Sequence, residues 1–248
     1  MSGTKDNPLK QFKIKVFADG ADLDSILDTY AEGNVDGFTT NPTLMNKAGI
    51  TNYMAFAREV LRTVTDLPVS FEVFSDEFDQ MYEQALRLKA LGDNVVVKIP
   101  ITNTRGESAC PLIKKLSAEG MKLNITAILT LDQVREVFEA LHPDTSAFVS
   151  VFAGRIADTG IDPLPIMKES LEILKPKPKA ELLWASPREA FNIFQAEEMG
   201  CHIITVLPAL LAKARFFGMP LEDLSLETVK MFYNDAAHSG FRIIEPEP

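Results

Sequence analysis

Short apolar runs alternate with longer segments of helical spacing along almost the whole chain. The run 95–100 is nearly continuous in Val and Ile, as in parallel strands that are covered on both faces. Between such runs, apolar residues recur three and four positions apart, which predicts amphipathic helices. The pattern predicts strands over 13–19, 37–40, 69–73, 95–100, 122–126, 147–152, 181–186 and 202–207. It predicts helices from Leu23 to about Gly33, over 53–64, from a cap at Ser75 to Gly92, and over 110–119, 131–141, 164–174, 188–199 and 210–217. A final helix is expected over 226–238, within a C-terminal segment of about 221–242.

Eight strand–helix units in 248 residues predict an α/β fold, a single (β/α)8 TIM barrel with an additional C-terminal helix. The main alternative is an open α/β sheet, which often carries a glycine-rich phosphate loop after its first strand. The sequence has no such loop there, and this favours the barrel. Residues 1–248 are expected to form one domain, with a polar N-terminal extension at 1–12.

Composition and charge narrow the possible partners. Hydrophobic residues make up 46% of the chain and charged residues 24%, as in an ordinary soluble protein. The net charge of −10 and the lack of a basic run predict no nucleic-acid partner, and any anion site must be local. No apolar run approaches the ~20 residues of a membrane span, and residues 1–11 show no signal-peptide pattern. Cys110 and Cys201 are expected to be reduced thiols of a cytoplasmic protein.

Lys98 is the most informative polar residue, because it interrupts the apolar strand 95–100. A lysine inside a buried strand is rare unless it has a partner or a function. Burial disfavours a charged amine, so Lys98 is a candidate Schiff-base nucleophile. The structural alternatives are a lysine that reaches from the strand end to solvent, or one that is paired with Asp19 or Glu72.

Two carboxylates lie near the ends of other predicted strands, where barrel enzymes place their chemistry. Glu72 is flanked by Phe71 and Val73, so alternation puts it on the opposite face from these apolar neighbours. Asp19 could face the barrel axis, or it could instead cap the helix that begins at about Asp22.

A candidate anion site follows the sixth and seventh strands. Arg155 comes shortly after Phe152, and Arg188 follows Ser186 at the predicted start of a helix. An arginine and a serine hydroxyl at a helix N-terminus suit a phosphate group. The alternative is that Arg188 is only an exposed residue of the first helical turn.

Six segments, in order along residues 13–217, resemble the transaldolase family, which includes small transaldolases and fructose-6-phosphate aldolases. They are Phe17-Ala-Asp-Gly-Ala21, Thr39-Thr-Asn-Pro-Thr43, Val96-Val-Lys-Ile-Pro100, Asn124-Ile-Thr126, Ser150-Val-Phe-Ala-Gly-Arg-Ile156 and Ala185-Ser-Pro-Arg188. Each motif alone is weak, but six in register on successive strands are specific.

The resemblance implies a role for each matching position. Lys98 matches the Schiff-base lysine, Asp19 the acid/base at the C4 hydroxyl, and Glu72 with Thr126 the pair that holds a catalytic water. Binding of substrate hydroxyls falls to Asn41, Asn124 and Ser150, and binding of phosphate to Arg155, Ser186 and Arg188. The implied activity is transfer of dihydroxyacetone between sugar phosphates in carbohydrate metabolism, as in the pentose phosphate pathway. It needs no cofactor or metal, and the three histidines, at positions 142, 202 and 238, are too scattered to serve a zinc-dependent aldolase.

Two regions bear on the subtype. The aldolase branch of the family carries glutamine at the place of Glu72 and tyrosine at the place of Phe152. Phenylalanine cannot donate a proton to the enamine, which favours transfer over release of free dihydroxyacetone. Near the implied phosphate site, Trp184 and Pro187 depart from the family. Proline removes an N–H that could contact the anion, so a sulfonated ketose is an alternative donor.

Small members of the family pack a C-terminal helix on a neighbouring subunit. The final helix carries Val229, Met231, Phe232 and Tyr233, and we therefore expect a homo-oligomer. The alternatives to transaldolase activity are aldolase-type cleavage of fructose 6-phosphate and a non-catalytic binding barrel, and the set of Lys98, Asp19 and Glu72 speaks against the binding barrel.

Overall fold

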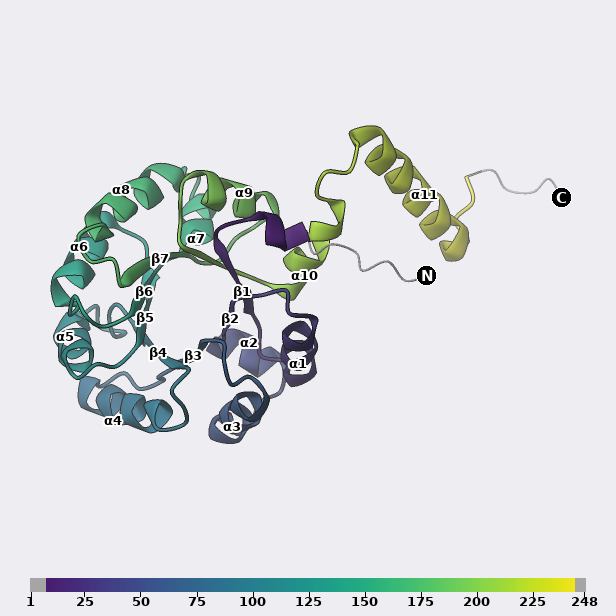
Figure 1. Cartoon of the computed structure of the whole chain (residues 1–248). Coiled ribbons are helices and arrows are strands. Elements are labelled where there is room, and N and C mark those ends of the chain that lie inside the picture. The colour runs from purple at the N-terminus through teal and green to yellow at the C-terminus, as the bar shows by residue number, and fades with distance from the viewer. Residues whose placement is uncertain (1–7, 244–248) are drawn as a thin grey trace.

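The computed structural model describes residues 8–243 and contains a closed barrel of eight parallel strands. Each strand pairs with the next along the chain, and the eighth pairs with the first (Figure 1). The predicted (β/α)8 barrel is therefore confirmed, and the alternative of an open sheet is wrong. The strands are β1 (Lys15–Asp19), β2 (Gly37–Thr39), β3 (Val69–Glu72), β4 (Val95–Pro100), β5 (Leu123–Ile128), β6 (Ala147–Val151), β7 (Ala180–Trp184) and β8 (Ile203–Val206).

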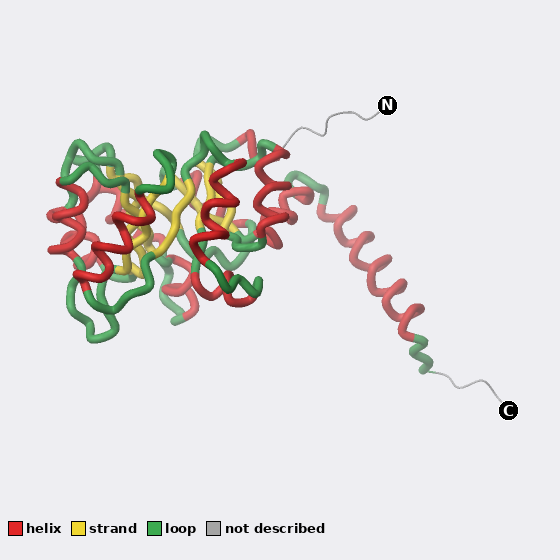
Figure 2. The backbone as a smooth tube through the Cα atoms, turned by 90° about the horizontal axis from the view of Figure 1, so that it is seen from below, coloured by secondary structure: helices red, strands yellow, loops and turns green. Residues whose placement is uncertain are grey.

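Helices surround the strands as an outer ring (Figures 1 and 2). The helical elements are η1 (Pro8–Gln11), α1 (Leu23–Glu32), α2 (Pro42–Lys47), α3 (Tyr53–Thr63), α4 (Phe78–Lys89), α5 (Cys110–Ala118), α6 (Leu131–Ala140), α7 (Ala153–Asp158), α8 (Leu164–Leu174), α9 (Phe191–Glu198), α10 (Pro208–Leu211), η2 (Ala212–Phe216) and, outside the ring, α11 (Leu221–Ser239). Within residues 8–243, no helix is both long and apolar enough to cross a membrane.

The alternation of side chains along β4 explains the position of Lys98. Val95, Val97 and Ile99 pack between the strands and the outer helices. Val96 belongs to the apolar cluster in the barrel interior, together with Phe17 and Phe148. Because residues two apart on a strand share a face, Lys98 lies on the interior face with Val96, nearer the carboxyl end of the strand.

Local details differ from the sequence predictions. The short helices α2 and α7 follow β2 and β6 directly and were not predicted. Ser75 does not cap α4, which begins after Glu77. The predicted helix 188–199 begins only at Phe191, and the predicted helix 210–217 is the short α10 followed by η2.

The first described residues pack against the barrel, whereas the last helix extends away from it. Of the expected N-terminal extension 1–12, residues 1–7 are outside the described part; Leu9 is buried and Phe12 packs edge-on against Phe194. At the other end, α11 projects away from the barrel and has no buried residue (Figures 1 and 2).

Candidate active site

One cavity of about 340 Å³ opens at the carboxyl ends of the strands, and all eleven predicted site residues line it. This is the end of a barrel at which enzymes place their chemistry. The residues are Asp19, Asn41, Glu72, Lys98, Asn124, Thr126, Ser150, Phe152, Arg155, Ser186 and Arg188. Residues that are far apart in the sequence therefore share one chamber.

Lys98 lies on the wall of this cavity and is only 7% exposed. Its Nζ lies 3.1 Å from Oε2 of Glu72 and donates a hydrogen bond of 3.1 Å to the carbonyl of Thr40. Its burial rules out a lysine that reaches out to solvent. The pairing with Glu72 is present, and it places a carboxylate against the amine at the edge of the cavity.

Asp19 ends β1 and accepts a hydrogen bond of 2.8 Å from the Thr39 hydroxyl. The Asn41 amide lies 3.3 and 3.4 Å from its two oxygens. The cap of α1 is Asp22, which accepts from the N–H of Ser25, so the alternative of Asp19 as that cap is wrong. Burial raises the pKa of Asp19, and the positive charge of Lys98 partly opposes this. A carboxyl with a raised pKa is suited to both accept and return a proton.

The hydroxyl of Thr126 is buried on β5 and lacks a hydrogen-bond partner within residues 8–243. Buried hydroxyls are nearly always satisfied, so an orphan that lines a cavity is free to bond a small molecule there. Strand register places Glu72 beside Lys98, and Pro100 beside Thr126. The expected pair of Glu72 and Thr126 thus flanks the β4 segment that carries the lysine.

Three further polar side chains are fixed by hydrogen bonds. Ser150 donates to Oδ1 of Asn124 at 2.6 Å, and Nδ2 of Asn124 donates to the Ser70 hydroxyl at 3.1 Å. Oδ1 of Asn41 caps α2 by accepting from Leu44, which leaves its amide nitrogen toward Asp19. These hydrogen bonds fix the orientation of polar side chains that line the cavity.

The end of the cavity near Arg155 and Arg188 has an unusual backbone. Ser186 has a left-handed φ of 58°, a conformation that non-glycine residues rarely adopt. A Cβ added at Gly154 would lie 1.6 Å from the carbonyl oxygen of Ser186. Glycine is therefore required at 154 for the chain after β7 to pass this close to α7.

Arg188 lies before α9 rather than on its first turn, so the prediction of an arginine at a helix N-terminus is wrong. Its Nε donates to Oδ1 of Asp158 at 2.9 Å, and NH2 contacts the other oxygen. This bond lowers the pKa of Asp158, which therefore stays ionised beside the arginine. Arg155 lies with its guanidinium 5.7 Å from the centre of the Phe152 ring.

Sequence reasoning gave no role to three residues that hold this site. Thr39 bonds Asp19, and its hydroxyl lies 2.5 Å from that of Thr205. Asp158 pairs with Arg188. Both threonines occupy strand ends, which is a signal that could have singled them out, whereas only a tertiary contact reveals Asp158.

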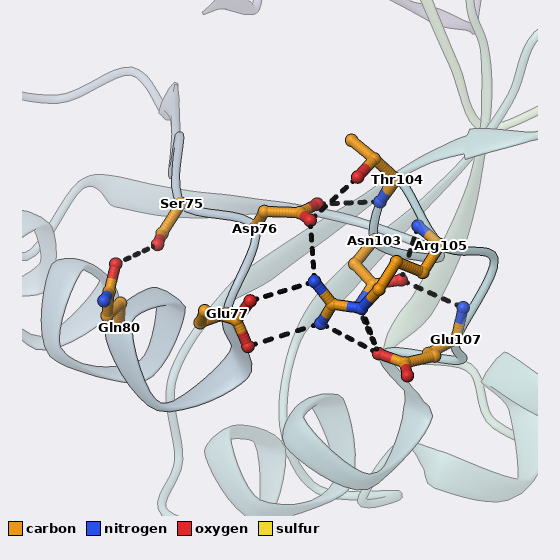
Figure 3. A network of polar contacts seen from close by, with 8 residues as sticks. All are labelled: Ser75, Asp76, Glu77, Gln80, Asn103, Thr104, Arg105 and Glu107. Carbon is orange, nitrogen blue, oxygen red and sulfur yellow. Dashed lines mark hydrogen bonds and ion pairs between the residues drawn. The ribbon is translucent and has the colours of Figure 1, made fainter.

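A polar network links the two loops that follow β3 and β4, the strands of Glu72 and Lys98. Figure 3 shows the Arg105 guanidinium between Asp76 and Glu77 of one loop and Glu107 of its own loop, at 3.1, 2.9 and 3.0 Å. Thr104 adds a backbone bond of 2.7 Å to Asp76. Four charged side chains thus hold the two loops together beside the cavity.

Comparisons with known proteins agree with the geometry. The sequence profile of the family described as Transaldolase/Fructose-6-phosphate aldolase matches residues 16–243. A probable transaldolase of Nitrosopumilus maritimus is 35% identical over 216 residues, which cover 86% of this chain and 92% of that protein. A probable transaldolase of a Thermoanaerobacter species is 34% identical over 231 residues, which cover 93% of this chain and 100% of that protein.

A solved structure shows the same fold at much lower identity. The crystal structure of KGPDC from Streptococcus mutans matches with a TM-score of 0.55 and 12% identity, over 80% of this chain and 90% of that one. At this identity the likeness supports the barrel architecture alone.

Proposed function

The chain belongs to the Transaldolase/Fructose-6-phosphate aldolase family, and on this premise we propose that it is a transaldolase acting through a Schiff base on Lys98. The proposed reaction moves a dihydroxyacetone unit from a ketose phosphate, fructose 6-phosphate or sedoheptulose 7-phosphate, to an aldose phosphate. The observation that carries the proposal is the position of Lys98: buried on the cavity wall, against Glu72 and within the field of Asp19.

The proposed steps give the two carboxyl groups different roles in moving protons. The neutral amine of Lys98 adds to the ketose carbonyl, and loss of water leaves an iminium ion. Asp19 takes the proton of the C4 hydroxyl while the C3–C4 bond breaks, which releases an aldose phosphate and leaves an enamine on Lys98. Glu72, with the Thr126 hydroxyl, holds the water that carries protons during formation and hydrolysis of the imine. The enamine then adds to an acceptor aldehyde, whose oxygen takes the proton back from Asp19, and hydrolysis of the resulting iminium frees the product and the Lys98 amine.

Borohydride trapping tests this proposal. Incubation with fructose 6-phosphate and borohydride should add a reduced dihydroxyacetone or hexose unit to Lys98, detected by mass spectrometry of the peptide. The matched control is Lys98→Arg, which retains a cation beside Glu72 but cannot form a Schiff base. An adduct of equal yield in Lys98→Arg, or no adduct in the unchanged enzyme, contradicts the proposal.

Transfer and simple aldol cleavage differ in the fate of the enamine. Phe152 lines the cavity without a hydroxyl, so the proposed enamine waits for an acceptor. The variant Phe152→Tyr should release free dihydroxyacetone from fructose 6-phosphate at least several-fold faster in the absence of an acceptor. Equal release by both enzymes would instead assign aldolase activity to the unchanged chain.

A second candidate donor is a ketose that carries a sulfonate. Asp158 neutralises part of the charge of Arg188, and Pro187 has no N–H to offer the anion. The sum of Arg155, Arg188 and Asp158 is one positive charge, which suits a monoanionic sulfonate better than a phosphate of about −1.5 to −2. Relative kcat/KM for fructose 6-phosphate and 6-deoxy-6-sulfofructose decides between the donors, and a clear preference for phosphate excludes the sulfonate.

We propose that the enzyme works as a homo-oligomer in the cytoplasm. The support for an oligomer is the exposed apolar surface of α11. The support for the compartment is chemical: Cys110 and Cys201 are both free thiols.

A further inference from the structure

Tyr53 of α3 places its hydroxyl on the backbone of Glu72. The hydroxyl oxygen accepts from the N–H of Glu72 at 2.7 Å, and the hydroxyl donates to the carbonyl of the same residue at 3.0 Å. One side chain therefore satisfies both backbone polar groups of the residue whose carboxylate pairs with Lys98.

The strand register shows which partners Tyr53 replaces. Along β2 and β3, the N–H of Phe38 donates to Pro68 at 2.9 Å, and that of Thr40 donates to Ser70 at 3.2 Å. One further step of a parallel ladder would send the N–H of Glu72 to the Thr40 carbonyl, and the N–H of residue 42 to the Glu72 carbonyl.

The chain uses neither of those two partners for Glu72. Residue 42 is a proline that begins α2 and has no N–H. The carbonyl of Thr40 accepts from Nζ of Lys98 instead, at 3.1 Å. The hydroxyl of Tyr53 stands in for both missing partners of Glu72, and the Thr40 carbonyl is left to the lysine.

We propose that Tyr53 is a positioning residue for the Lys98–Glu72 pair. By closing the β2–β3 seam where β2 ends, it fixes the backbone from which the Glu72 carboxylate reaches Lys98. It also leaves the Thr40 carbonyl as a second anchor for the amine. This inference rests on the proposed function, in which Lys98 is the nucleophile and Glu72 handles the water.

The surroundings of Tyr53 suit this role. Its ring is held edge-on by Phe74, with centroids 4.5 Å apart, and by Phe71 at 6.1 Å. Burial raises the pKa of Tyr53 above its ordinary value, so the hydroxyl stays protonated and can donate and accept at once.

The variant Tyr53→Phe tests the inference, because it retains the ring and removes the hydroxyl, with its two hydrogen bonds to the Glu72 backbone and its interaction with the Thr40 side chain. We expect kcat and the rate of borohydride trapping at Lys98 to fall roughly ten- to hundredfold, the scale at which small misplacement of reacting groups acts. KM should change little, and the pH profile of trapping should shift, because Glu72 no longer faces Lys98 in a fixed geometry. Tyr82→Phe is the control: its hydroxyl bonds Glu119 on the outside of the barrel, at 3.2 Å.

A double-mutant cycle with Glu72→Ala, which removes the side chain that Tyr53 is proposed to position, separates positioning from general destabilisation. If Tyr53 acts through the Glu72 side chain, then Tyr53→Phe should lower the residual trapping rate of Glu72→Ala by no more than about twofold. Full multiplication of the two single losses would overturn the inference. So would kinetics of Tyr53→Phe that equal those of Tyr82→Phe.

A second variant covers the case in which Tyr53→Phe does not fold. Phe74 is 50% exposed, so Phe74→Ala should fold while loosening the Tyr53 ring. We expect it to lower kcat and shift the pH profile in the same direction, by a smaller factor; unchanged kinetics would contradict the inference. The absence of any adduct in the unchanged enzyme would mark failure of the proposed function itself, whereas trapping that is insensitive to Tyr53→Phe and Phe74→Ala would mark failure of this inference alone.

Discussion

At the scale of single residues, the buried carboxyl of Asp19 makes a prediction about stability and pH. Its folded-state pKa is raised, so its ionised form is disfavoured in the folded protein. The contribution of Asp19 to stability is therefore full below its unfolded pKa, near 3.8, and is lost as the pH rises through the folded value. The variant Asp19→Asn should unfold at a higher temperature than the unchanged enzyme at neutral pH, and this gain should shrink toward pH ~4.

The same variant should lose activity by a factor of about 10² to 10⁴, as removal of a general acid/base does. Calorimetry across pH and a coupled assay measure the two effects. Asp28→Asn removes an exposed carboxylate and is the control for a change in net charge. A lower melting temperature of Asp19→Asn at neutral pH would contradict the assigned sign.

Asp158 makes a second prediction, about specificity for the anion. Asp158→Asn removes the negative charge that pairs with Arg188. The kcat/KM for dianionic substrates should therefore rise relative to that for monoanionic ones. Both side chains are about half exposed, so we expect the ratio of kcat/KM for fructose 6-phosphate over 6-deoxy-6-sulfofructose to rise roughly two- to tenfold. Asp132→Asn, which breaks a surface pair with Arg135, should leave the ratio unchanged. A ratio that falls in Asp158→Asn would show that Asp158 instead holds Arg188 in its binding position.

The eleven predicted residues that line the cavity could be found because each lies at or near a strand end and most fall within a motif. Lys98, for example, is visible as a lysine inside an apolar strand. The residues that hold them are not visible in this way. Tyr53 lies on the outer helix α3. Its hydroxyl bonds the backbone of Glu72 because β2 ends at Thr39 and does not pair with Glu72. Such partners depend on how far apart two elements lie in the fold, and the periodicity of the sequence does not predict that distance.

At the scale of elements, all eight strands were found with each end within two residues, since apolar runs and alternation mark them strongly. The short helices α2 and α7 were missed because each has only six residues. A helix that short shows no repeated apolar face. Proline and glycine, which appear in the sequence as loop signals, here sit in helices: Pro42 begins α2, and Gly154 allows α7 to approach Ser186.

The loops after β3 and β4 make a prediction at this scale. Arg105→Gln removes the cation that joins Asp76, Glu77 and Glu107, and leaves three carboxylates facing one another. We expect a lower melting temperature and faster amide hydrogen exchange in both loops, with the difference reduced at high salt, because the network is exposed. Arg62→Gln, which breaks only a pair within α3, is the control. Equal exchange in the two variants would show that the network does not restrain the loops.

At the scale of the whole molecule, closure of the barrel follows from the number of strand–helix units, whereas the direction of α11 does not. The C-terminal helix was expected, and it leaves the barrel instead of covering a strand (Figures 1 and 2). Its exposed side chains include Leu226 at 53%, Val229 at 60%, Phe232 at 63% and Tyr233 at 74%. Contiguous apolar exposure of this kind marks an interaction surface on a soluble protein.

The surface of α11 makes the last prediction. If it packs on another copy of the chain, then Phe232→Glu should bury a charge in that contact and shift the assembly to a smaller species in sedimentation velocity. Because the cavity that holds Lys98 lies within one barrel, borohydride trapping at Lys98 should persist in the smaller species. Asp235→Asn, on the same helix, should leave the assembly intact. A sedimentation coefficient of Phe232→Glu that equals that of the unchanged enzyme would contradict a subunit contact at this helix, while loss of trapping together with dissociation would show that the neighbouring subunit supports the active site.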